Sequence, residues 1–247
     1  MQIQIHSSKL ELGEAVAREG AEAIAAAISG KGDAVVVFAT GASQFEMLDA
    51  LVGYDLDWSR VTAFHLDEYV GLSADHKASF RRYLRERVAE RLPALREFVM
   101  VEGDSPDINA EVARLNARLA PLAVDVCFAG IGENCHLAFN DPPADFTTTE
   151  PYLVVELDEA CRRQQANEGW FASIADVPSR AVSMSIRQIM KSEKLILAVS
   201  DTRKAEAVRH ALEGPVTPDY PASIIQQHPA ASIHLDRAAA ALLTQQS

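Results

Sequence analysis

The stretch GIGENCHLAFND, residues 130–141, has the residue types of a catalytic turn. It begins with two closely spaced glycines directly after an apolar run, 124–129, and it contains His136 and Asp141. Histidine titrates near neutral pH, which suits general acid/base catalysis. Asp141 precedes Pro142, and because a residue before proline avoids the α conformation, the segment can bend back and bring the carboxylate to the imidazole. The stretch therefore predicts a histidine that an aspartate orients.

A dinucleotide-binding turn is one alternative for the same stretch. Gly130 and Gly132 fit the first two positions of the GxGxxG fingerprint, but Cys135 stands where the third glycine belongs, and that glycine lets the helix pack closely on the strand. The two glycines still permit a sharp turn and a close approach of backbone to ligand. A partly buried structural histidine is the other alternative, although a glycine-rich turn at a strand end favours an active site for His136.

A second candidate lies in VTAFHLDEYV, residues 61–70, where two carboxylates, Asp67 and Glu68, follow an apolar run. Neighbouring side chains of a strand point to opposite faces, so only one of the two can face a shared site. Asp67 comes directly after the apolar residues and is the predicted one. The alternative is a solvated acidic strand end, which is common in a chain with 35 acidic residues.

Two further segments predict an anion site. The turn Thr40-Gly41-Ala42-Ser43 joins a strand to a helix, whose free amides can bind a phosphate, although no GK[ST] follows as in a Walker loop. In Ser200–Lys204, a helix start carries Arg203 and Lys204 in its first turn. Cations there oppose the helix dipole at a cost of about 0.3 to 1 kcal/mol, which a bound anion reverses. A solvent-facing Arg-Lys pair is the alternative.

The elements that must position these residues follow from the apolar pattern. Short apolar runs without alternation predict strands covered on both faces at 34–39, 61–66, 124–129 and 195–199. Helical spacing predicts helices at 12–28, 44–52, 77–92, 107–119 and 203–212. Strands alternating with helices indicate an open, doubly wound, mostly parallel α/β sheet of the Rossmann-like type with helices on both faces. Ligands of such sheets bind beyond the carboxyl ends of the strands, where the candidate segments lie. We expect one domain over residues 1–247.

Composition limits the classes of function. Hydrophobic residues make up 48% and charged residues 23% of the 247, as in soluble globular domains. A net charge of −12 argues against a nucleic-acid or anionic-membrane partner. The start of the chain lacks the pattern of a signal peptide, and no apolar run approaches the roughly 20 residues of a membrane span, so we expect a cytoplasmic protein. Three cysteines without CxxC or zinc-ligand spacing predict no structural metal.

The motifs together resemble the glucosamine-6-phosphate deaminase/isomerase family, which shares a superfamily with the 6-phosphogluconolactonases. The resemblance is carried in order by the Thr40-Gly41 turn, DEYVGL (67–72), GIGENCHLAFND, DTRK (201–204), LEGPV (212–216) and QHP (227–229). It implies that glucosamine 6-phosphate and water become fructose 6-phosphate and ammonia by acid/base catalysis, with no cofactor. The implied partner is a small-molecule sugar phosphate. Because relatives include monomers and hexamers, a homo-oligomer stays open, as does a preference for galactosamine 6-phosphate.

The resemblance also implies roles for individual residues. Asp67 would move a proton between C2 and C1 of the sugar, and His136 would assist opening of the ring. Asp141 would orient or charge that histidine, and Asn134 matches a position that holds aspartate or asparagine in the family. The residues implied in substrate and phosphate binding are Thr40, Gly41, Ala42, Ser43, Gly132 and Lys204.

Three departures from the family pattern bear on the substrate. Ala42 stands where a phosphate-contacting serine is common, and Asp141 is shorter than the usual glutamate. In the expected lid, 150–178, the stretch 166–170 lacks the phosphate-binding arginine of the family, which Arg162 or Arg163 could replace. A 6-phosphogluconolactonase-type hydrolase and a non-catalytic sugar-phosphate sensor are therefore the alternative functions.

Overall fold

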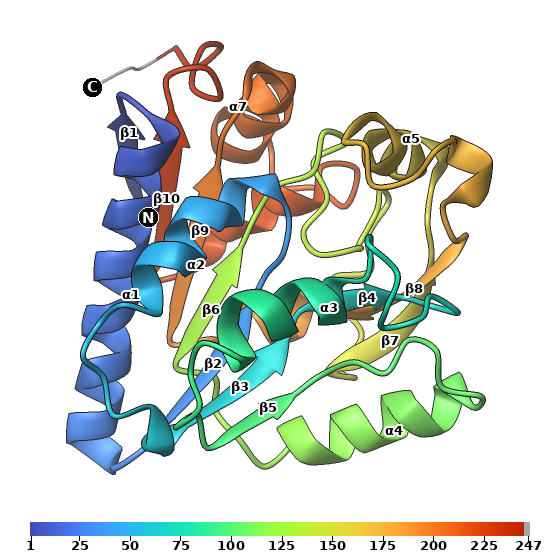
Figure 1. Ribbon diagram of the computed structural model, residues 1–247. Coiled ribbons are helices and arrows are strands. Elements are labelled where there is room, and N and C mark those ends of the chain that lie inside the picture. The colour runs from blue at the N-terminus through green and yellow to red at the C-terminus, as the bar shows by residue number, and fades with distance from the viewer. Residues whose placement is uncertain (245–247) are drawn as a thin grey trace.

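A central sheet of seven parallel strands organises the computed structural model, which describes residues 1–244 (Figure 1). The strand order is β1-β10-β9-β6-β2-β3-β5. The bounds are β1 Gln2–His6, β2 Ala34–Phe38, β3 Val61–His65, β5 Glu97–Val99, β6 Val126–Ala129, β9 Lys194–Val199 and β10 Ala231–Asp236. The chain proceeds outward from β2 through β3 to β5 and then returns to the other side of β2 with β6. This reversal between β2 and β6 is a topological switch point, the place where open α/β sheets bind ligands.

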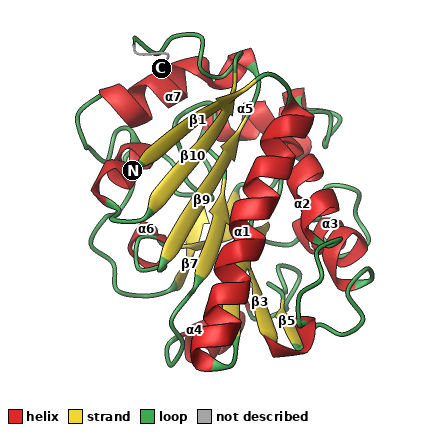
Figure 2. Ribbon diagram, turned by 90° about the vertical axis from the view of Figure 1, so that its left-hand side faces the viewer, coloured by secondary structure: helices red, strands yellow, loops and turns green. Residues whose placement is uncertain are grey.

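Helices cover both faces of the sheet, as the apolar runs predict. Alternate residues of β2 face opposite ways: Val36 and Phe38 pack with α1 and α2, whereas Val35 and Val37 pack with α4 and α7. Figure 2 shows α1 lying along one of these faces. The helices are α1 Lys9–Lys31, α2 Phe45–Leu51, α3 Phe80–Leu84, α4 Ile108–Leu119, α5 Glu159–Asn167, α6 Ile186–Ile189 and α7 Ala205–Glu213. The prediction of a mostly parallel α/β sheet is confirmed.

The predicted helix over 77–92 begins later and is less regular than expected. Ser79 caps α3 by accepting a hydrogen bond from the backbone N–H of Arg82, so the residues before it form a turn. After Leu84 the chain continues as a π-helical turn, Arg85–Ala89. The expected helix over 203–212 likewise starts as a 3-10 turn, Thr202–Lys204, before α7.

A second sheet of three antiparallel strands was not predicted. It comprises β4 Asp67–Tyr69, β8 Arg180–Met184 and β7 Tyr152–Glu156. Leu66 connects the two sheets: its N–H donates to Phe38 in the central sheet, and its carbonyl accepts from Met184 in the small one. This junction places Asp67 at the carboxyl edge of the central sheet. Within residues 1–244, no helix combines the length and the apolar character that a membrane span requires.

The contact between α1 and α2 depends on a glycine. A Cβ on Gly13 would lie 2.4 Å from the Cβ of Glu46 and 2.8 Å from the backbone nitrogen of Met47, so Gly13→Ala must displace backbone. We expect this variant to lose about 1 to 3 kcal/mol of unfolding free energy, measured by urea denaturation. Gly30→Ala, in the same helix with nothing within 4 Å, is the control and should gain about 0.5 to 1 kcal/mol. Equal losses in both variants would contradict the packing argument.

Candidate active site

One cavity lies at the switch point, bounded by the loops that follow β2, β3, β6 and β9. The space within it, open solvent included, is about 830 Å³. The sequence-predicted residues in its wall are Thr40, Gly41, Ala42, Ser43, Asp67, Gly132, His136 and Lys204. Residues far apart in the chain are thus gathered around a single space. Asn134 and Asp141 lie behind His136 and are not in the wall.

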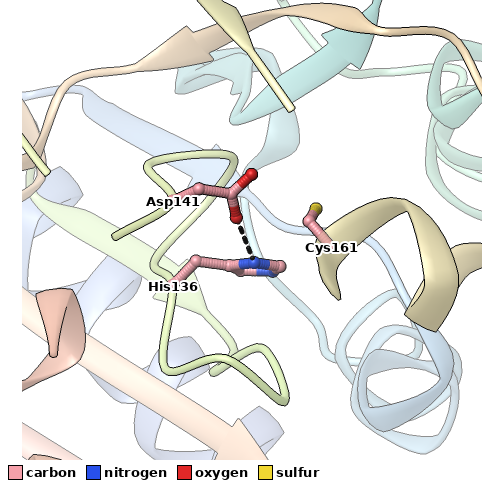
Figure 3. Close-up of side chains that lie close together, drawn as sticks. All are labelled: His136, Asp141 and Cys161. Carbon is pink, nitrogen blue, oxygen red and sulfur yellow. Dashed lines mark hydrogen bonds and ion pairs between the residues drawn. The ribbon is translucent and has the colours of Figure 1, made fainter. Parts of the chain in front are cut away.

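His136 and Asp141 form a hydrogen-bonded pair, shown in Figure 3, with 3.0 Å between Nδ1 of the imidazole and Oδ1 of the carboxylate. Burial alone would raise the pKa of Asp141. Hydrogen bonds from His136, from Asn134 Nδ2 at 2.9 Å and from the backbone N–H of Asp158 at 2.9 Å outweigh burial and lower it. Asp141 is therefore ionised at neutral pH and accepts the Nδ1 proton, which leaves Nε2 available to a ligand in the cavity.

Asn134 forms hydrogen bonds with both residues of this pair. Its side-chain amide donates to Asp141 and, at 3.1 Å, to Asp158, while its Oδ1 accepts from the backbone N–H of His136 at 3.3 Å. These contacts are those of a residue that positions the histidine–aspartate pair. A direct catalytic role for Asn134 stays a prediction.

Gly132 is required by the approach of the imidazole. A tight turn, closed by hydrogen bonds from Cys135 N–H to Gly132 and from Gly132 N–H to His136, folds the ring back over the glycine. A Cβ at this position would lie 2.3 Å from Nε2 and 2.4 Å from Cδ2 and Cε1 of His136. The glycine thus fixes the ring position, in addition to lining the cavity.

Gly132→Ala is expected to lower kcat/KM by about 10²-fold, because the imidazole must move by about 1 Å to make room for the methyl group. Steady-state kinetics on the amino sugar phosphate that the sequence resemblance implies measures the loss. Gly130→Ala is the matched control in the same turn: its Cβ would lie 3.5 Å from Gln44 Nε2 and 3.7 Å from the carbonyl of Ala198, ordinary contact distances. We expect a much smaller loss there, and similar losses in both would refute this explanation of Gly132.

Asp67 faces the cavity, and Glu68 faces away from it. Burial, with the nearby charge of Glu68 second, raises the pKa of Asp67 well above its ordinary value. The Glu68 carboxylate accepts from Ser79 Oγ at 2.8 Å and from the backbone N–H groups of Arg81 and Tyr69. This division of the two carboxylates is the one that strand alternation predicts.

The two predicted anion-binding segments meet in the cavity. The turn Thr40–Ser43 leads into the 3-10 helix Ala42–Gln44, which precedes α2. Ser43 Oγ accepts a hydrogen bond from Ser200 Oγ, which belongs to the segment Ser200–Lys204, at 3.4 Å. Lys204 ends the 3-10 helix that Asp201 caps, and its side chain is buried. Burial lowers the pKa of Lys204, and the nearby Glu168 partly opposes that shift. A buried cation beside helix starts is suited to holding an anion.

The segment 150–178 contributes four cavity residues that the sequence did not indicate. They are Gln164, Gln165, Glu168 and Trp170, on α5 and directly after it. Neither arginine considered as a phosphate ligand in this segment lines the cavity. Arg162 donates to the carbonyls of Ile174 and Val177, and Arg163 pairs with Glu159 on the exposed side of the helix. Arg203, beside Lys204, does line it.

His136, Asp141 and Cys161 lie close enough to suggest a metal site. Their candidate ligand atoms are all within 4.8 Å of one another (Figure 3). A metal here would have to displace the hydrogen bond of His136 Nδ1 and ionise a fully buried thiol, and burial raises the pKa of Cys161. The contacts therefore favour a hydrogen-bonded pair over a ligand set. Absence of a metal stays a prediction.

Comparison with known sequences identifies the family of the chain. The chain matches the family model described as glucosamine-6-phosphate isomerases/6-phosphogluconolactonase over residues 7–234. It is 40% identical over 213 residues to a glucosamine-6-phosphate deaminase of Exiguobacterium sp., covering 86% of this chain and 82% of the relative. It is 37% identical over 245 residues to a glucosamine-6-phosphate deaminase of Lactobacillus delbrueckii subsp. bulgaricus, covering 98% and 100%.

Solved structures of the same family also resemble this chain. A monomeric glucosamine-6-phosphate deaminase superposes with a TM-score of 0.87 at 33% identity, covering 98% of this chain and 100% of that one. A 6-phosphogluconolactonase from Trypanosoma brucei superposes with a TM-score of 0.81 at 19% identity, covering 98% of each chain, which is a likeness of fold alone. The chain therefore belongs to the glucosamine-6-phosphate isomerase/6-phosphogluconolactonase family.

Proposed function

We propose that the protein is a glucosamine-6-phosphate deaminase, which converts glucosamine 6-phosphate and water into fructose 6-phosphate and ammonia. The observation that carries the proposal is the placement of Asp67, His136 and Lys204 in the wall of one cavity. A lactonase needs a base to activate water but no second acid/base group for transfer between carbons. The relatives that are 37 to 40% identical are named as deaminases, whereas the lactonase structure is only 19% identical.

The first chemical step opens the pyranose ring. His136 accepts the proton of the O1 hydroxyl on Nε2 and returns it to the ring oxygen, while the C1–O5 bond breaks and C1 becomes an aldehyde. Asp141 stabilises the imidazolium that forms between the two transfers, because its carboxylate accepts the Nδ1 proton at 3.0 Å. The turn at Thr40–Ser43 and Lys204 hold the phosphate so that the opened chain stays in register.

The second step moves a proton from C2 to C1. Asp67 removes the C2 proton, the electron pair forms a C1=C2 double bond and O1 takes a proton from the C2 ammonium group of the substrate. Return of the proton from Asp67 to C1 leaves an iminium ion at C2, which water hydrolyses to the ketone and ammonium. A carboxylate of ordinary pKa is a weak base toward carbon, so the raised pKa of Asp67 suits this task.

A two-product assay tests the proposal. Ammonia and fructose 6-phosphate should appear in equal amounts from glucosamine 6-phosphate, with galactosamine 6-phosphate as the epimer control. Release of acid from 6-phosphogluconolactone without ammonia production from either amino sugar would support a lactonase instead. Calorimetric binding of glucosamine 6-phosphate without turnover would support a sensor.

Three expectations about the protein's setting stay predictions. The three cysteines are buried and unpaired, which is consistent with the cytoplasmic location that we propose. A homo-oligomer and the absence of nucleic-acid and membrane partners also stay predictions. The expected lid, 150–178, supplies cavity residues, and its opening and closing are part of the proposal.

A further inference from the structure

Glu168 places a carboxylate in the wall of the cavity from the segment 150–178. It directly follows α5, and its side chain is only 11% exposed. Gln164 Nε2 donates to Oε1 at 2.9 Å, and Trp170 Nε1 donates to Oε2 at 3.3 Å. Both donors belong to the same segment as Glu168. The carboxylate is therefore held in a fixed position by its own part of the chain.

This carboxylate faces the buried cation of the cavity. Oε1 of Glu168 lies 4.0 Å from Nζ of Lys204, whose side chain is 8% exposed. The neighbouring Arg203 is engaged with Glu133 and Asp201 at 3.3 Å each, so its charge is already compensated at the surface. Glu168 thus occupies the side of Lys204 on which an anionic ligand in the cavity would lie.

We propose that Glu168 competes with the substrate's phosphate for Lys204 and thereby lowers the affinity for the substrate. The inference rests on the proposed function, which places a phosphate at Lys204. A phosphate beside this lysine carries a charge of about −1.5 to −2 at neutral pH. Two like charges close together in the cavity repel each other. Phosphate binding therefore has to move Glu168 away before Lys204 is available.

This competition also affects the contacts of Glu168. Its carboxylate accepts from Gln164 and Trp170, and Gln164 Oε1 in turn accepts from the backbone N–H of Glu133, so displacement of the carboxylate disturbs these hydrogen bonds. Phosphate replaces this internal anion at Lys204. Glu168 lowers the affinity for phosphate and in this way sets KM rather than the chemical step.

Calorimetric titration of inorganic phosphate into the whole protein tests the inference without requiring turnover. Glu168→Gln and Glu168→Ala should both bind phosphate about tenfold more tightly than the unmodified protein, which corresponds to about 1.4 kcal/mol. For glucosamine 6-phosphate, KM should fall by a similar factor and kcat should change little. Glu159→Gln makes the same change of charge on the exposed side of α5 and should leave the dissociation constant unchanged.

A purely structural role of Glu168 gives the opposite result. If Glu168 only held the segment in place, both variants would bind phosphate less tightly or equally, and that outcome overturns the inference. Lys204→Met should weaken phosphate binding, and unchanged binding would also overturn it, because the phosphate would then lie elsewhere. If no variant binds phosphate, the inference is likewise overturned. Failure of the unmodified protein to release ammonia counts instead against the proposed function.

Discussion

Asp67→Asn is expected to reduce kcat for glucosamine 6-phosphate by about 10⁴-fold, the upper end of what one acid/base group contributes. The reason is that one carboxylate performs both transfers, from C2 and to C1, so its loss affects two steps. Asparagine has nearly the same shape and cannot accept the proton. Ammonia release measures turnover, and loss of C2 proton exchange into deuterated water, followed by NMR, locates the defect at the first transfer.

Glu68→Gln is the matched control for this prediction. The neighbouring carboxylate faces Ser79 and the start of α3, outside the cavity, so its removal should cost far less activity. Glu68 raises the pKa of Asp67, so neutralising it should shift the acid limb of the kcat/KM profile to lower pH. Wild-type turnover in Asp67→Asn, or equal losses in the two variants, would exclude Asp67 as the base.

The second large effect concerns acid stability and His65. This side chain in β3 is fully buried, its Nδ1 accepts from the backbone N–H of Val101 at 3.4 Å, and its Nε2 has no partner among residues 1–244. Burial, followed by the charge of Arg81, lowers the pKa of His65 to about 3. In the unfolded chain the value is about 6.5. The native state thus excludes a proton that the unfolded state binds below about pH 6.5.

The sign of this linkage is fixed by the direction of the pKa shift. Stability from a neutral His65 is fully present above about pH 6.5 and is lost as the pH falls toward 3. The difference in pKa corresponds to about 4 to 5 kcal/mol, of which about 3 should be lost by pH 4. His65→Asn keeps an acceptor for Val101 and does not titrate. Urea denaturation from pH 7.5 to 4 should therefore give a shallower fall for the variant.

Other titrating groups do not interfere with that comparison. Hydrogen bonds from His234, Lys194 and Ser232, which outweigh the opposing effect of burial, lower the pKa of Glu19 to about 2, so this carboxylate also costs stability below about pH 4.5. Both proteins carry Glu19, and its contribution cancels in the difference. Parallel stability curves for the two proteins would show that His65 does not carry the effect.

Four strands of the central sheet, β2, β3, β6 and β9, could be predicted from the sequence because their residues are mostly apolar. All five residues of β2, for example, are buried, and the run reads as a strand without further information. β10 was missed because Ser232 and His234 interrupt its apolar pattern. Both are nevertheless buried, since each bonds to Glu19 on α1 at 2.7 Å. A partner more than two hundred residues away leaves no local signal in the sequence.

Some residues of the candidate site could likewise be predicted from the sequence, and others could not. Asp67, His136 and Lys204 could be selected because each follows a predicted strand, and parallel strands end at one edge. The cavity residues of α5 could not be selected, because a polar helix reads as exposed. Gln164 is held in its buried position by a tertiary contact, because its Oε1 accepts from the backbone N–H of Glu133 at 2.8 Å.

The position of β10 between β1 and β9 has a consequence for synthesis of the protein. Gln2 pairs in register with Ser232, so β1 has no neighbour in the sheet until β10, more than two hundred residues later in the chain, leaves the ribosome. Until β10 has been made, β1 is an unpaired strand, and α1 lacks part of the sheet surface that it covers. The nascent chain thus completes its sheet only after β10 has been made, and exposed edges invite association with other chains in that interval.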